Sequence, residues 1–105
     1  MTDLEIATKM VAKAQNAKSR GIPFEISFKH FKKLMLQKRC AYTKQILVEP
    51  GGHVKDNQRS IDRVDASVGY TDANTVVCTH SFNVMKANLT IEALHQIMHV
   101  VLTKK

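Results

Sequence analysis

The chain has 105 residues, of which 44% are apolar, and its 16 Lys and Arg outnumber 9 Asp and Glu to give a net charge of +7. This length fits one domain with a modest core, and the apolar share excludes a wholly disordered chain. The surplus of positive charge favours a polyanionic partner such as DNA, because neutralised phosphates release condensed counterions, although it could equally serve solubility.

A basic, helical region is predicted at the N-terminus. Thr2 and Glu5 form a capping box that begins the first helix, and Gly21 with Pro23 ends it. A second helix follows shortly afterwards. The apolar residues expected to face the core are Ile6, Met10, Val11, Ala14 and Ala17 in the first helix, and Phe28, Phe31, Leu34 and Met35 in the second.

Four short segments with β-branched or alternating apolar residues are expected to be extended: 24–27, 45–48, 59–65 and 74–78. Pro50 breaks the chain after the second of these, and a polar loop at 53–58 leads into the third. A further helix is expected from about Ser81. Thr90 caps a last helix, whose inward residues are Ile91, Leu94, Ile97, Met98 and Val101. This order of elements predicts an α+β domain.

The two cysteines do not form a zinc-binding pattern. Cys40 and Cys78 stand alone, whereas a structural zinc needs four ligands that usually come from two close-spaced pairs. We therefore expect no structural zinc, and two reduced, buried thiols.

Most of the functional signal lies in residues 59–88, which read RSIDRVDASVGYTDANTVVCTHSFNVMKAN. The segment holds an acid on an expected strand (Asp62), a Gly69-Tyr70 turn, an Asn before a β-branched run, and a second Asn near the start of a helix. Together with GIPFEIS and LMLQKRCAYT upstream, it resembles phage-type members of the HNH endonuclease family over about residues 20–90.

The resemblance implies an α+β fold of the ββα-metal (HNH) type in a single domain, 1–105. Its core, a short β-hairpin followed by a metal-site helix, would occupy residues 40–90. The helical basic part, 1–39, and a C-terminal helix, 91–105, would flank this core. The implied activity is metal-dependent hydrolysis of DNA phosphodiester bonds by an endonuclease that a phage or mobile element encodes.

The resemblance also implies the metal ligands. Asp62 matches the carboxylate that the family carries on a strand, and Asn83 matches the ligand that it carries on a helix. Both offer hard oxygens, which suit one Mg²⁺ or Mn²⁺ ion. Asn74 matches the middle Asn of the family pattern, with the expected structural role of tying a loop to the metal-bearing strand by hydrogen bonds.

Arg63 departs from the pattern of the best-known HNH enzymes, which have a His general base after the metal Asp. A guanidinium stays protonated and cannot take a proton from water. Arg63 could instead clamp the phosphate and stabilise its charge. The candidate bases are His53 in the polar loop and His80 near the helix start, followed by Tyr70 after the turn.

Basic residues are expected to contact DNA. Lys86 resembles the NxxK lysine of the family, which would face phosphate. So small a domain leaves little surface for reading bases, so we expect low specificity unless a protein partner or a homodimer supplies recognition. The other candidates for DNA contact are Arg59, Lys32, Lys33, Lys38 and Arg39.

An alternative function is a catalytically degenerate HNH fold that binds DNA or a host protein without cutting. Arg63 motivates it, as do Thr43, Thr79 and Phe82, which stand where many relatives have zinc-binding cysteines. We expect the Phe82 ring to fill part of the space that zinc would take.

A soluble, cytoplasmic protein is expected, in a bacterial host if a phage encodes it. The chain has no signal-peptide pattern and no apolar run near the ~20 residues that cross a bilayer. A membrane partner is therefore not expected.

Overall fold

The computed structural model describes residues 1–49, 51–53, 55–86, 89–90, 92–93, 95–96 and 99. The elements in chain order are α1 (Asp3–Ser19), β1 (Phe24–Glu25), α2 (Phe28–Leu36), β2 (Arg59–Arg63), β3 (Tyr70–Thr71), β4 (Thr75–Thr79) and α3 (His80–Lys86). The predicted α+β class is confirmed. In this described part of the chain, no helix is long and apolar enough to cross a membrane.

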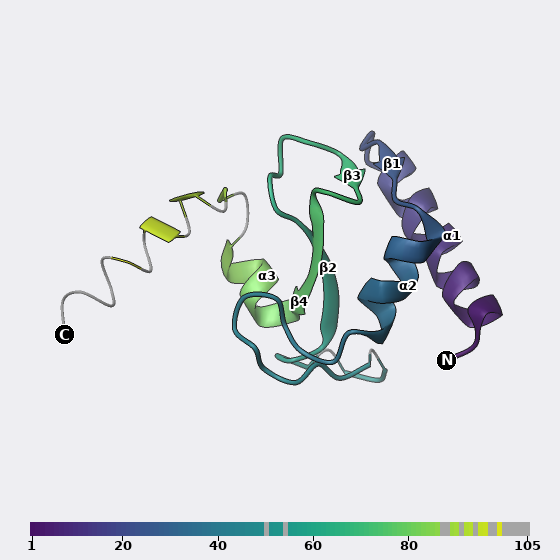
Figure 1. Ribbon diagram of the computed structural model, residues 1–105, viewed down its shortest axis with the longest axis horizontal. Coiled ribbons are helices and arrows are strands. Elements are labelled where there is room, and N and C mark those ends of the chain that lie inside the picture. The colour runs from purple at the N-terminus through teal and green to yellow at the C-terminus, as the bar shows by residue number, and fades with distance from the viewer. Residues whose placement is uncertain are drawn as a thin grey trace.

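A β-hairpin followed directly by a helix forms the centre of the fold. β2 pairs antiparallel with β4, from Arg59 opposite Thr79 to Arg63 opposite Thr75, and α3 begins at the residue after β4. In Figure 1, α1 and α2 lie side by side on one side of this hairpin, and α3 lies on the other. The hairpin therefore has a helix layer on each face.

Local sequence signals explain the helix starts. The capping box of α1 is confirmed, since the Thr2 hydroxyl accepts a hydrogen bond from the Glu5 N–H and the Glu5 carboxylate accepts one from the Thr2 N–H. Ser27 caps α2 by accepting from the His30 N–H. The main core cluster collects buried side chains from these helices and the strands: Ile6, Ala17, Ile26, Phe31, Leu34, Met35, Cys40, Leu47, Ile61, Tyr70, Val77 and Cys78.

Three local predictions are wrong. Residues 45–48 make only isolated bridges, between Ile46 and Arg39 and between Val48 and Gln58, rather than a strand. Val11 is 57% exposed and Phe28 is 38% exposed, although both were expected to face the core. Both side chains lie outside the main core cluster.

The parallel pairing of β1 with β3 was not predicted, since each strand has only two residues. Phe24 aligns with Tyr70, and the Tyr70 N–H donates to the Pro23 carbonyl at 2.9 Å. A Cβ at Gly69 would lie 2.8 Å from the same carbonyl oxygen, so only glycine allows this approach. The predicted helix from Ile91 falls largely on residues outside the described ones, although the Thr90 hydroxyl accepts from the Ala93 N–H.

Asp72 reinforces the start of α2 and makes its stability depend on pH. Its carboxylate accepts from the Ser27 N–H at 2.8 Å and from the Ser27 hydroxyl at 2.7 Å. These bonds, the backbone one first, lower the pKa of Asp72 below its ordinary 3.8. The stabilisation is therefore complete above the unfolded pKa and is lost as pH falls through the folded pKa. Thermal unfolding followed by circular dichroism from pH 2 to pH 7 should show a lower Tm at pH 7 for Asp72→Asn, with a shallower decline in acid.

The matched control for this measurement is Glu25→Gln, which removes the same charge from exposed β1 without touching the Ser27 cap. Its acid profile should follow that of the wild type. Identical profiles for Asp72→Asn and Glu25→Gln would contradict the assigned role of Asp72.

Candidate active site

The hairpin and α3 bring two polar residues of β2 against two of the helix. The Asn83 side-chain amide donates to the Ser60 hydroxyl at 2.8 Å. One turn further along α3, the Lys86 Nζ lies 3.1 Å from Oδ2 of Asp62. Ser60 and Asp62 are alternate residues of a strand and so share a face, while Asn83 and Lys86 are three apart on a helix. The residue spacing of the strand and that of the helix together bring these four side chains into contact.

Asp62 is 6% exposed and is held by two neighbours through one oxygen. Its Oδ2 accepts a 2.8 Å hydrogen bond from the Tyr42 hydroxyl as well as the ion pair with Lys86. Burial, and then the Asp62 carboxylate, raise the pKa of Tyr42 far above its ordinary value, so that Tyr42 stays the donor. Every buried side-chain polar atom among the described residues has a hydrogen-bond partner. Oδ1 has no hydrogen-bond partner among these residues, which leaves it available to a ligand.

The cavity beside Asp62, here called the Asp62 cavity, has a volume of about 290 Å³. Asp62 and Asn83 both line it, so the structure brings together the two residues expected to bind metal. Asp62 is the only acid among its described lining residues. The remaining lining residues are Lys13, Arg20, Ser60, Ile61, Arg63, Ala66, Tyr70 and Val84.

Three cations in the cavity surround Tyr70. The Arg20 guanidinium donates to the Tyr70 hydroxyl at 3.4 Å. Lys13 Nζ lies 5.1 Å from the centre of the Tyr70 ring, and Arg63 Cζ lies 5.3 Å from it. Such contacts hold cations over an aromatic face. Tyr70 therefore positions positive charge beside Asp62, and its buried ring packs against Phe24.

Lys13 and Arg20 are functional candidates that sequence reasoning missed. They are seven residues apart on α1 and its C-cap, and Lys9 precedes Lys13 by four. This spacing places all three on one helical face, a signal present in the sequence.

Asn74 and Arg63 shape the loop that closes one side of the cavity. The Asn74 side chain accepts from the Asp65 N–H at 2.9 Å and donates to the carbonyls of Asp65, Val68 and Gly69. Arg63 donates to the carbonyls of Ala66 and Val68. Asn74 therefore has the structural role expected for it, since it ties the loop to the end of β2.

Lys86 does not have the position predicted for a DNA contact. Its side chain is fully buried, and its ammonium group bonds Asp62 and the carbonyls of Arg63 and Val64. A phosphate would have to displace these three partners. Lys86 is therefore a buried residue that joins α3 to the end of β2. This position corrects the prediction that it contacts DNA phosphate.

The Arg59 side chain is also bonded to partners within the protein. Its side chain is 7% exposed, pairs with Glu49 at 3.0 Å and donates to the Leu34 carbonyl. Arg59 is thus held by Glu49 and Leu34 and does not line the Asp62 cavity, and its predicted contact with DNA stays a prediction. The other predicted basic contacts, Lys32, Lys33, Lys38 and Arg39, do not line the Asp62 cavity, and Lys32 pairs with Asp3 at 2.9 Å.

The structure separates the three candidate bases. His53 lies in an exposed loop, and His80 begins α3 with its N–H bonded to the Gln58 carbonyl. Neither histidine lines the Asp62 cavity, so a role for either as the base stays a prediction. Tyr70 does line it.

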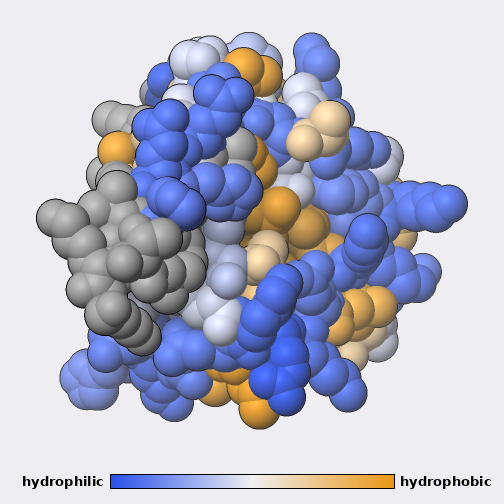
Figure 2. Space-filling view, turned by 60° about the vertical axis from the view of Figure 1, so that its left-hand side comes forward, coloured by the Kyte–Doolittle hydropathy of each residue, from blue (hydrophilic) through white to orange (hydrophobic). Residues whose placement is uncertain are grey.

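Figure 2 shows a largely hydrophilic face with apolar surface near its centre.

The positions at which the HNH resemblance would have placed zinc ligands contact one another or their neighbours. The Thr43 N–H lies 3.4 Å from Cys40 Sγ, and the Phe82 N–H donates to the Thr79 hydroxyl. The buried Phe82 ring stacks on Tyr42 with centroids 4.7 Å apart. Aromatic packing thus fills this corner, where it supports the residue that bonds Asp62. Burial raises the pKa of the nearby Cys78 thiol to about 12.

The donor set of the Asp62 cavity fits a hard divalent cation with few protein ligands. Asp62 and Asn83, which both line the cavity, carry carboxylate and amide oxygens, and Mg²⁺ commonly takes one or two carboxylates plus waters and substrate phosphates. No cluster of three or more His, Cys, Asp or Glu that could bind metal occurs among the described residues. A cation held here would therefore need ligands from water or from a bound phosphate.

The chain is similar to a protein of Enterobacteria phage T4 that is described as "Uncharacterized 29.0 kDa protein in dda-modA intergenic region". The two are 28% identical over 79 residues, which are 75% of this chain and 31% of the phage protein. This chain thus spans about a third of the length of that curated relative. No family model matches the chain, and no solved structure matches it significantly.

Proposed function

We propose that the protein is a metal-dependent endonuclease of the HNH type that hydrolyses DNA phosphodiester bonds, encoded by a phage or mobile element. One observation carries the proposal: Asp62 on the hairpin and Asn83 on α3 line a single cavity in which they are surrounded by Lys13, Arg20 and Arg63. A hairpin followed directly by a helix is the arrangement that the HNH resemblance implies. The similarity to a phage protein supports the proposed origin.

The charges of the cavity suit a phosphodiester. One carboxylate faces three cations, and the ammonium of Lys86 already balances much of its charge. An isolated cation would meet net positive charge there, whereas a phosphate would be attracted. Phosphate and cation are therefore expected to bind together, each lowering the cost of the other.

Each lining residue has a role in this proposal. Arg63 and Arg20 hold the phosphate oxygens, with Arg63 braced by the carbonyls of the loop. Asp62 and Asn83 would hold the cation, which supplies charge neutralisation at the scissile phosphate. The Tyr70 hydroxyl, beside Arg20, is the remaining candidate for handling a proton in the cavity.

Plasmid nicking tests the proposal. Wild-type protein should relax supercoiled plasmid with Mg²⁺ or Mn²⁺ and not with EDTA. Asn83→Ala should slow the reaction about a hundredfold, because it removes an oxygen that positions the cation. The control Asn16→Ala changes an exposed amide on α1 and should cut like the wild type.

The alternative is a fold that binds DNA or a host protein without cutting. The Lys86–Asp62 ion pair supports it, because a carboxylate already paired at 3.1 Å attracts a metal less strongly. No cleavage with either metal, at protein concentrations that give salt-sensitive DNA binding, would favour this alternative over the enzyme.

A further inference from the structure

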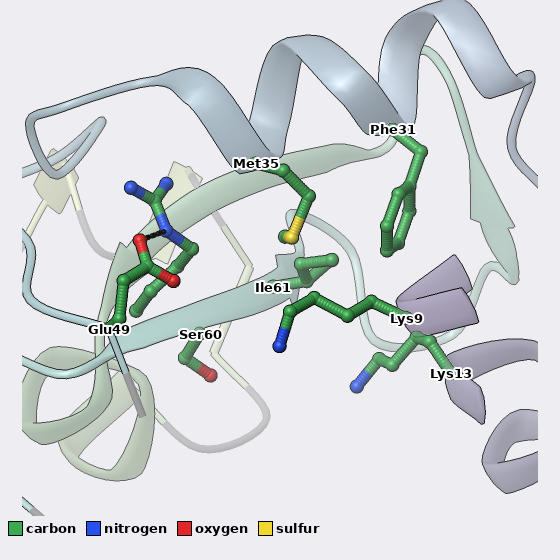
Figure 3. A pocket seen from close by; sticks show the side chains of 8 residues that line it. Lys9, Lys13, Phe31, Met35, Glu49, Ser60 and Ile61 are labelled. Atoms are coloured by element: carbon green, nitrogen blue, oxygen red, sulfur yellow. Dashed lines mark hydrogen bonds and ion pairs between the residues drawn. The ribbon is translucent and has the colours of Figure 1, made fainter. Parts of the chain in front are cut away.

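A second cavity, here called the Lys9 cavity, is lined by residues of α1, α2 and β2. It has a volume of about 230 Å³ and shares Lys13, Ser60 and Ile61 with the Asp62 cavity. Figure 3 shows Lys9 and Lys13 reaching from α1 toward β2, below Phe31 and Met35 of α2. The two cavities are thus adjacent.

The Lys9 cavity combines apolar walls with two lysines. Phe31, Met35 and Ile61 supply carbon and sulfur surface. The one acid among its described lining residues, Glu49, is already paired with Arg59 at 3.0 Å, as the dashed line in Figure 3 shows. Neither Lys9 nor Lys13 forms an ion pair with the residues that the structure describes. A fitting ligand therefore has an apolar ring and an anionic group.

Ser60 connects the two cavities chemically. Its hydroxyl oxygen accepts the hydrogen bond from Asn83, so its own proton is turned away from that amide. Within the described residues this proton has no acceptor. A phosphate oxygen lying between the cavities could take it.

We propose that the Lys9 cavity binds the base of an unpaired nucleotide, whose phosphate lies between Lys9, Lys13 and Ser60. This inference rests on the proposed function, since it places the base next to the phosphate that the Asp62 cavity would hold. The volume is below the roughly 300–1,000 Å³ of sites for whole small molecules, which suits one base. A base stacked in a duplex cannot enter a cavity between helices. The substrate class is therefore DNA with an unpaired nucleotide at or beside the scissile bond.

The methyl group of Met35 reports on a base in this cavity. In NMR spectra of protein with ¹³C-labelled methionine methyl groups, recorded in EDTA, thymidine 3′,5′-bisphosphate should shift the Met35 signal through the ring current of its base. Deoxyribose 5-phosphate and inorganic phosphate should leave that signal in place. Met85, 66% exposed on α3, is the internal reference and should not move.

Reversing the charge of Lys9 tests whether it contributes to binding. Lys9→Glu should weaken binding of thymidine 3′,5′-bisphosphate about tenfold, since Lys9 lines this cavity and not the Asp62 cavity. Lys18→Glu makes the same change on the same helix away from both cavities and should bind like the wild type.

The failures of the two proposals are distinguishable, because this binding is measured without metal or cleavage. A Met35 signal that stays in place, or that moves equally with the sugar phosphate, overturns the base site even if the protein nicks DNA. A selective Met35 shift that Lys9→Glu weakens supports the base site even if no nicking is found.

Discussion

Replacing Lys86 with methionine is expected to lower the free energy of unfolding by about 3–5 kcal/mol, because it leaves the buried Asp62 carboxylate without its counter-ion. Methionine keeps much of the apolar stem but cannot replace an ammonium group that bonds Asp62 and the carbonyls of Arg63 and Val64. Those two acceptors then lose their donor in a buried position. Urea unfolding followed by circular dichroism measures the loss.

The matched control is Lys33→Met on the exposed surface of α2, which should change stability by no more than about 0.5 kcal/mol. The double variant Lys86→Met with Asp62→Asn should lose less than the sum of the single variants, because each single change leaves a buried partner unpaired. A Lys86→Met protein as stable as the wild type would contradict the structural role and return Lys86 to the set of DNA contacts.

The elements with strong local signals could be predicted from the sequence. The capping box at Thr2 and the β-branched run before Cys78 give α1 and β4 close to their predicted places, and α2 contains the apolar residues predicted for the second helix. The β1–β3 pairing could not be predicted, since two-residue strands carry no period and depend on Gly69 approaching Pro23. Residues 45–48 have the composition of a strand but lack a continuous partner.

At the candidate site, the resemblance to HNH endonucleases located the residues on the hairpin and α3 but not their chemical state. Asp62 and Asn83 share a cavity as the resemblance implied. The sequence does not indicate that the Lys86 side chain is buried and pairs with Asp62. Helical spacing is the same for a buried lysine and an exposed one. Lys13 and Arg20 reach the site from α1 through tertiary packing, and that packing is not encoded within the 59–88 segment.

Asp62→Asn should lower the nicking rate per folded molecule about a thousandfold. A bound cation typically supplies several kcal/mol of transition-state stabilisation, and each ~1.4 kcal/mol corresponds to a factor of ten in rate. Asparagine keeps the shape of the side chain and an oxygen for the Tyr42 hydroxyl, but it removes the charge that would hold the cation. Plasmid nicking at saturating Mn²⁺ gives the rate, and circular dichroism gives the folded fraction.

Comparison with Lys86→Met separates a ligand from a merely structural partner. Both variants break the same buried ion pair and should lose stability, so a structural role for Asp62 predicts equal activity per folded molecule. A metal-ligand role for Asp62 predicts that the two variants differ in activity per folded molecule. Lys86→Met removes a cation 3.1 Å from the carboxylate, so it should stay within about tenfold of wild-type activity and reach half of its maximal rate at a lower Mn²⁺ concentration. If the two variants lose activity equally once corrected for folding, Asp62 stabilises the fold and the cation must bind elsewhere.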